Sequence, residues 1–216
     1  MPQISSKRIY FNVALFFLVA LVGCLADLLT KYYAFKNLGM PGEYFAVEPV
    51  KGSYWLINGV FGFQTVLNEG GLFGMGQGHV DWLSGFSFVA LIGIGVWMFC
   101  SAKKSLLLSL TFGLFVAGIF GNLYDRLGMP RLIWNYSNEC HQIGEPVYAV
   151  RDWILVMIGS YHWPNFNIAD SMIVCGVGLM LYHLFFVNDP GCSKDICAGS
   201  TTTEDFPKKN ADAKSE

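Results

Sequence analysis

Apolar residues form four long runs along the chain, and each run is long enough to be a membrane-spanning helix. The runs cover residues 9–26, 83–100, 106–121 and 173–187. A helix of about 20 apolar residues crosses the hydrocarbon core of a bilayer, which is about 30 Å thick. The fourth run extends back to Ile168 and there includes Asp170, whereas the four cores contain no Asp, Glu, Lys or Arg. This pattern predicts a mainly α-helical membrane protein with four transmembrane helices.

Composition agrees with this pattern. Of the 216 residues, 53% are hydrophobic and only 14% are charged. Soluble domains are about 45–50% apolar and about 25% charged, so an ordinary soluble domain and general disorder are both excluded. The net charge is −2 and the chain has no basic stripe, which argues against a nucleic-acid partner.

Basic residues predict the orientation of the four helices. Lys7 and Arg8 precede the first run, and Lys103 and Lys104 lie between the second and the third. Basic residues favour the cytoplasmic side of a membrane, so both termini are expected to be cytoplasmic. Residues 1–187 then form the membrane domain, and the polar residues 188–216 form a disordered cytoplasmic tail.

The two long connections are therefore expected on the outer side. Alternating β-forming residues predict a small antiparallel sheet within about residues 40–80. The second connection contains an outer-side insertion at about residues 127–150, followed by an apolar stretch at 153–158. No second, soluble domain is expected.

The first run also permits another interpretation. Lys7, Arg8, an apolar run and then residues 21–24 (LVGC) are similar to a lipoprotein signal peptide, which would be removed. Removal would leave three spans and place the outer connections on the wrong side, so we favour a retained helix.

Polar side chains gather where three of the predicted helices reach the outer side. These residues are Asp27, Asn122, Asp125, Arg126, Asn167 and Asp170, with Asp152 in the connection before the fourth helix. A charged residue in a membrane helix costs about 2.5–3.5 kcal/mol and is usually functional. Interfacial anchoring explains any one of them, but less easily the whole set. Asp27 and Lys31, four residues apart, are expected to form a structural ion pair, and Asp125 is expected to pair with Arg126.

Two carboxylates that meet at a poorly hydrated interface share a proton, as in aspartic proteases. No Ser-His-Asp, Ser-Lys or Cys-His signature competes, and the four histidines are isolated in the sequence. Cys140 and His141 are adjacent but lack further metal ligands, so neither a metal nor an organic cofactor is expected. The residues alone leave open whether Asp125 or Asp152 belongs to the pair.

Five short segments, in order, resemble the bacterial lipoprotein signal peptidases (signal peptidase II). They are residues 27–31 (DLLTK), 68–73 (NEGGLF), 118–126 (GIFGNLYDR), 150–153 (VRDW) and 166–171 (FNIADS). The resemblance covers about residues 9–187. It implies an intramembrane aspartic endopeptidase that cuts prolipoproteins on the N-terminal side of a diacylglyceryl-modified cysteine.

By the same resemblance, the catalytic pair falls on Asp152 and Asp170, and Asp125 takes a supporting role. The residues expected around the substrate and the pair are Asn68, Gly70, Asn122, Arg126 and Asn167. The partners expected are prolipoproteins and membrane lipids, and the chain is expected to be monomeric. Two departures from the family pattern are Leu72, where a small residue is common, and the long stretch between Arg126 and Asp152, whose residues 135–146 are a candidate lid.

Two other functions remain open from the residues alone. The acids of a small ion or proton carrier would form a relay across the bilayer. In a non-catalytic membrane subunit, the same acids would only anchor helix ends.

Overall fold

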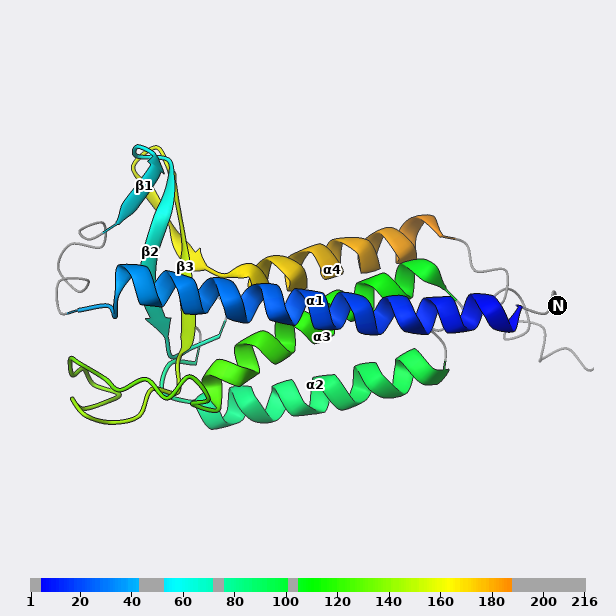
Figure 1. Ribbon diagram of the computed structural model, residues 1–216, viewed down its shortest axis with the longest axis horizontal. Helices are drawn as coiled ribbons and strands as arrows, with labels where there is room; N and C mark the ends of the chain where they lie inside the picture. Colours follow the sequence, from blue (N-terminus) through cyan, green and yellow to red (C-terminus); the bar gives the residue numbers. More distant parts are fainter. Residues whose placement is uncertain (1–4, 43–52, 72–75, 101–104, 188–216) are drawn as a thin grey trace, which may run out of the picture.

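Four helices form an elongated bundle that carries a small β-sheet at one end (Figure 1). The computed structural model describes residues 5–42, 53–71, 76–100 and 105–187. The helices are α1 (Ser6–Leu38), α2 (Val80–Cys100), α3 (Leu106–Arg126) and α4 (Ile168–Phe186). All four are long and apolar enough to cross a membrane, as the hydrophobic pattern predicts. Leu72, Phe73, Lys103, Lys104 and the tail lie outside the described residues.

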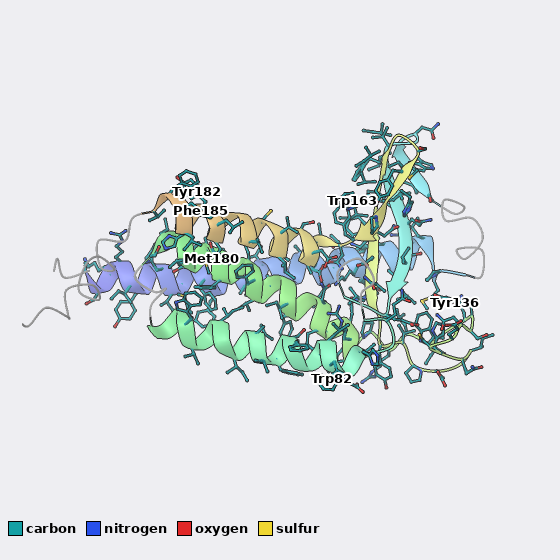
Figure 2. All side chains as sticks on the ribbon, turned by 180° about the vertical axis from the view of Figure 1, so that it is seen from behind. Trp82, Tyr136, Trp163, Met180, Tyr182 and Phe185 are labelled. Atoms are coloured by element: carbon teal, nitrogen blue, oxygen red, sulfur yellow. The ribbon has the colours of Figure 1, made fainter. Side chains whose placement is uncertain are left out.

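The surface of the bundle is apolar, as expected for helices that face lipid. Exposed side chains include Phe86 on α2, 68% exposed, and Leu184 on α4, 71% exposed. Trp82 and Trp163 lie near the sheet, and Tyr182 and Phe185 lie at the opposite end of the bundle (Figure 2). Aromatic side chains at both ends of a helical bundle are typical of the two membrane–water interfaces.

Helix α3 is the centre of the bundle and packs against α1, α2 and α4. Glycines permit this close packing at two positions. A Cβ on Gly118 would lie 2.5 Å from the carbonyl oxygen of Ala169 on α4, and a Cβ on Gly121 would collide with the carboxylate of Asp27 on α1. Small residues let membrane helices approach closely, and here they bring the polar ends of α1, α3 and α4 together.

Helix α1 is longer than the first apolar run. Its 33 residues correspond to about 50 Å, so the helix extends well beyond an apolar core of about 30 Å. No Gly or Pro interrupts the sequence between Gly23 and Gly39, and the helix ends at Gly39, whose φ is +83°. The added turns carry Lys31 and Phe35, both buried, to the sheet end of the molecule.

The sheet has four antiparallel strands in the order β1 (Tyr54–Ile57), β2 (Phe61–Asn68), β3 (Val150–Ile158) and β4 (Tyr161–Phe166). The predicted β region supplies only β1 and β2, whereas β3 and β4 come from the second connection. Because β2 and β3 pair with Asn68 opposite Val150 and Val66 opposite Asp152, the end of β2 lies beside Asp152.

Residues 128–149, between α3 and β3, form an irregular hairpin. Its two arms are joined by hydrogen bonds of 2.9 Å from Trp134 N to Glu145 O and from Val147 N to Leu132 O. Trp134 and Val147 are buried in a cluster with Phe35, Leu67 and Ala149. The hairpin therefore packs against both α1 and the end of β2.

Candidate active site

Asp152 on β3 is buried at the sheet end of the helical bundle, with 1% of its surface exposed. Its Oδ1 accepts a hydrogen bond of 2.6 Å from Asn167 Nδ2, and its Oδ2 accepts one of 3.2 Å from Asn68 Nδ2. The carboxyl group is thus held between the start of α4 and the end of β2.

Asp170 lies in the first turn of α4, and its position follows from the way this helix begins. Asn167 and Asp170 form a capping box, in which Asp170 N donates to Asn167 Oδ1 at 3.0 Å and Asn167 N donates to Asp170 Oδ2 at 3.1 Å. The remaining carboxylate oxygen, Oδ1, accepts a hydrogen bond of 2.8 Å from Asn122 Nδ2. Asp170 is only partly buried, so it faces the more open side of the site.

Two asparagines join the environments of the two carboxyl groups. The Nδ2 of Asn167 donates both to Asp152 and, at 3.1 Å, to Oδ1 of Asn122. Asn122 in turn donates to Asp170. Hydrogen bonds therefore link Asp152, Asn167, Asn122 and Asp170 in that order. These four residues form a frame that holds both acids between β3, α3 and the start of α4.

Burial raises the pKa of Asp152 well above its usual value. The negative charge of Asp170 raises it further, whereas Lys31 and the hydrogen bonds from Asn167 and Asn68 lower it in part. A carboxyl group with a raised pKa keeps its proton at a pH where an ordinary Asp is ionised. Of the two acids, Asp152 is therefore the one whose surroundings favour the protonated form.

A buried lysine lies behind this frame. Lys31 Nζ lies 2.8 Å from Asp27 Oδ2 and 3.1 Å from Asp125 Oδ2, and all three side chains are fully buried. The expected Asp27–Lys31 ion pair is present, and it is one part of a larger network. Asp27 Oδ1 also accepts a hydrogen bond of 2.9 Å from Ala169 N, which ties α1 to the start of α4.

The prediction that Asp125 pairs with Arg126 is wrong. Asp125 instead accepts hydrogen bonds from Arg151, at 3.1 Å from its backbone N and 2.9 Å from its Nε. Adjacent residues of a helix point in different directions, and Arg126 turns toward the end of β2. There its Nη2 donates a hydrogen bond of 3.0 Å to Gly70 O.

The residues that follow β2 form a tight turn beside Asp152. Asn68 Oδ1 accepts a hydrogen bond of 3.0 Å from Gly70 N, and Asn68 Nδ2 donates to Asp152. The structure therefore gathers every residue expected around the site: Asn68, Gly70, Asn122, Asp125, Arg126, Asp152, Asn167 and Asp170.

Sequence reasoning missed Glu69 and His141. His141, treated above as isolated, forms a hydrogen-bonded pair through Nδ1 with Glu69 Oε1, 72 residues away in the chain. No local spacing indicates such a pair. Among the described residues, no group of three or more His, Cys, Asp or Glu side chains is placed to hold a metal ion.

Comparisons with known proteins agree with this architecture. The family model described as signal peptidase (SPase) II matches residues 19–186. A lipoprotein signal peptidase of Rhodopirellula baltica is 37% identical over 177 residues, covering 80% of this chain and 72% of the relative. Another, from Bacillus velezensis, is 29% identical over 181 residues, covering 84% of this chain and 99% of the relative.

Two solved structures described as bacterial membrane enzymes share the fold, each with a TM-score of 0.60 and 23% identity. The matches cover 77% and 79% of this chain, and 85% and 92% of the solved chains. The family model alone spans well over half of the sequence, including all five short segments and the frame of carboxyl and amide groups. The chain therefore belongs to the signal peptidase II family.

Proposed function

We propose that this membrane peptidase removes signal peptides from prolipoproteins with Asp152 and Asp170 as its catalytic pair, cutting on the N-terminal side of the diacylglyceryl-modified cysteine. The observation that carries the proposal is the shared frame, in which Asn167 and Asn122 connect the two carboxyl groups. Two acids on one frame, one of them with a raised pKa, are the arrangement that aspartic proteases use.

The two environments assign the two roles. Burial and the charge of Asp170 raise the pKa of Asp152, so Asp152 is the acid that holds the proton. Asp170 accepts hydrogen bonds from a backbone N–H and from Asn122 at a helix N-terminus, and these contacts stabilise a negative charge. Asp170 therefore acts as the base and Asp152 as the acid.

In the first step, Asp170 takes a proton from a water molecule as the water oxygen attacks the scissile carbonyl carbon. Asp152 gives its proton to the carbonyl oxygen, which yields a tetrahedral diol. Collapse of the diol breaks the C–N bond, and the leaving nitrogen takes the proton that Asp170 had accepted. One diol hydroxyl returns its proton to Asp152, so both acids regain their starting states.

Polar side chains beside the pair are suited to hold an extended peptide. Within the described part of the chain, Nε of Arg126 is buried and has no hydrogen-bond partner. A guanidinium donates but does not accept, so this N–H is available to a carbonyl oxygen of the substrate. Gly70, whose carbonyl oxygen accepts from Arg126, and Asn68, which accepts from Gly70 N, complete this side of the site.

The membrane supplies part of the substrate orientation in this proposal. The diacylglyceryl chains lie among the membrane lipids and hold the scissile bond at the interface where the acids meet. The charge pattern supports cytoplasmic termini and a site at the outer face of the bacterial cytoplasmic membrane. One chain contributes both acids and their frame, which supports a monomeric enzyme. The acids lie at one end of the bundle, whereas a proton carrier needs them along a path across it.

Cleavage of matched substrates tests the proposed specificity. Purified full-length enzyme is given one prolipoprotein with and without the diacylglyceryl group, in the same detergent. We expect efficient cleavage of the lipidated form, with kcat/KM for the unlipidated form reduced at least about 100-fold, because orientation by the lipid is lost. Equal cleavage of the two forms would contradict the proposal.

A further inference from the structure

Glu69 and His141 connect the hairpin of residues 128–149 to the turn that holds Asn68. Glu69 directly follows Asn68, whose Nδ2 donates to Asp152 at 3.2 Å. The Glu69 carboxylate pairs with Nδ1 of His141, and the side chains of Glu69 and His141 are only 12% and 5% exposed. A buried, hydrogen-bonded pair of this kind restricts the groups that it joins more than an exposed pair does.

The imidazole of His141 is held firmly by its own hairpin. Its ring stacks on Trp134, with ring centroids 3.4 Å apart and planes inclined by 12°, and the Tyr136 ring packs against it in a T-shaped contact. At the tip of the hairpin, Asn138 Oδ1 accepts hydrogen bonds from the backbone N–H groups of Cys140 and His141, at 2.7 and 3.0 Å. The hairpin therefore holds the His141 ring in place, and the His141 ring in turn holds the Glu69 carboxylate.

The hairpin itself is anchored to the body of the molecule. Trp134 is 4% exposed and lies in one cluster with Phe35 of α1 and Leu67 of β2. Leu67 immediately precedes Asn68. The segment 67–70 is thus held at successive residues: Leu67 in the cluster, Asn68 on Asp152, Glu69 on His141, and Gly70 by Arg126.

The charge of Glu69 also affects its surroundings. Burial, together with the nearby Glu69 carboxylate, raises the pKa of Tyr136 to about 12. The hydrogen bond to Glu69 raises the pKa of the Cys140 thiol. The Glu69 side chain therefore faces Tyr136 and Cys140 of the hairpin as well as His141.

We infer that Glu69 and His141 are a positioning pair for the peptidase reaction: the hairpin, through His141, holds the Asn68 turn so that Asn68 keeps its hydrogen bond to Asp152. The pair does not touch the scissile bond. The inference rests on the proposed function, because it assigns the pair an effect on the proposed acid. It gives the long stretch between Arg126 and Asp152 a role as a support for the site instead of a lid.

Kinetics of single variants measure this effect. Glu69→Ala removes the acceptor, and His141→Phe removes the donor while keeping a ring against Trp134. Each variant is expected to lower kcat about tenfold, because small displacements of a group that orients a catalytic acid slow the reaction, with KM changed less than twofold. Glu69→Gln retains an acceptor and should recover most of kcat. Glu139→Ala, which removes an exposed acid of the same hairpin, is the matched control and should behave as wild type.

The Asn68→Ala background separates positioning from general stability. If the pair acts through Asn68, neither Glu69→Ala nor His141→Phe lowers kcat further in that background. Thermal unfolding in detergent, followed for every variant, shows which of them fold. The inference is overturned if folded single variants keep wild-type kcat, or if their effects multiply with that of Asn68→Ala.

A parallel Asp152→Asn variant distinguishes this inference from the proposed function. If Asp152→Asn still cleaves, the proposed function has failed. If Asp152→Asn is inactive while Glu69→Ala and His141→Phe turn over at the wild-type rate, only the positioning pair has failed. We expect Asp152→Asn to be inactive. We also expect Glu69→Ala and His141→Phe to lower kcat in the wild-type background but not in the Asn68→Ala background.

Discussion

Lys31 Nζ on α1 donates a hydrogen bond of 2.9 Å to Oδ1 of Asn122 on α3, 91 residues further along the chain. This contact and the hydrogen bond of 3.1 Å from Asn167 Nδ2 to the same oxygen decide which way the Asn122 amide points. With its oxygen directed at the lysine, its Nδ2 is directed at Asp170, to which it donates at 2.8 Å. Lys31, a buried cation with no contact to Asp152 or Asp170, therefore helps to orient the amide that donates to Asp170.

Lys31→Met is expected to destabilise the enzyme strongly. The substitution leaves the fully buried carboxylates of Asp27 and Asp125 without this cation, which typically costs about 3–5 kcal/mol. Thermal unfolding of the purified protein in detergent measures the loss, and cleavage of a lipidated prolipoprotein by the folded fraction should also fall. Lys36→Met, on the same helix near the Tyr32 ring, is the control and should leave both unchanged. Equal stability of the Lys31 and Lys36 variants would contradict the network.

Gly121→Ala tests the close approach of α3 to α1. The added Cβ would meet the Asp27 carboxylate, which Lys31 and Ala169 N hold in place. Crowding of this kind costs about 1–3 kcal/mol, so the unfolding temperature should fall. Gly93→Ala on α2 is the matched control, since nothing lies within 4 Å of its added Cβ, and it should be as stable as wild type or slightly more stable. A Gly121 variant as stable as this control would show that the packing is looser than described.

Asn68→Ala is expected to change the pH dependence of cleavage. The hydrogen bond from Asn68 lowers the pKa of Asp152, so its removal raises that pKa further. If Asp152 works in its protonated form, activity declines as pH rises through this pKa, and the alkaline limb of kcat/KM moves to higher pH in the variant. The apparent values belong to the coupled pair of acids. If the acid limb, and not the alkaline limb, moved to higher pH, Asp152 would be the base and the assigned roles would be reversed.

The same raised pKa has a consequence for stability. The folded state binds a proton on Asp152 more tightly than the unfolded state does. The contribution of Asp152 to the free energy of unfolding is therefore greatest below the ordinary Asp pKa and declines as pH rises through the raised pKa. At neutral pH the raised pKa of Asp152 therefore lowers the stability of the folded protein. Strongly shifted pKa values are common among the groups of active sites.

Cys140 provides a test of the orientation. It is exposed, on the hairpin at the sheet end, whereas Cys192 and Cys197 lie in the tail expected on the opposite side. A membrane-impermeant maleimide added to spheroplasts should modify Cys140 and reach the two tail cysteines only after permeabilisation. The hydrogen bond to Glu69 raises the pKa of the Cys140 thiol, so its labelling should accelerate as the pH is raised. Modification of Cys192 and Cys197 before permeabilisation, with Cys140 protected, would show that the orientation is the opposite of the expected one.

The sequence predicted the four helices because each is a continuous apolar run, but it predicted only half of the sheet. In β1 and β2 the alternation of β-forming residues was visible in the sequence. In β3, adjacent residues are buried, as Val150, Arg151 and Asp152 are, and apolar residues run without interruption through 153–158, so no period of two marks the strand. The fourth apolar run extends back to Ile168, where α4 begins, and the capping box of Asn167 and Asp170 explains why the helix starts there.

Contacts between distant segments could not be predicted in the same way. Asp125 has Arg126 beside it in the sequence, but its partner is Arg151, on a strand that comes later in the chain. Glu69 and His141 belong to different connections, and nothing in either segment indicates the other. The choice between Asp125 and Asp152 likewise came from the family resemblance, because both are acids next to an arginine.

The carboxyl pair is tested most directly by cleavage of a lipidated prolipoprotein with purified Asp152→Asn and Asp170→Asn enzymes, each checked for folding by thermal unfolding. Both substitutions keep the size of the side chain while removing the ability to exchange a proton. We expect each single variant to fold and to lose cleavage to below about one-thousandth of the wild-type rate, because acid and base act in the same step. Turnover near the wild-type rate by either folded variant would contradict it.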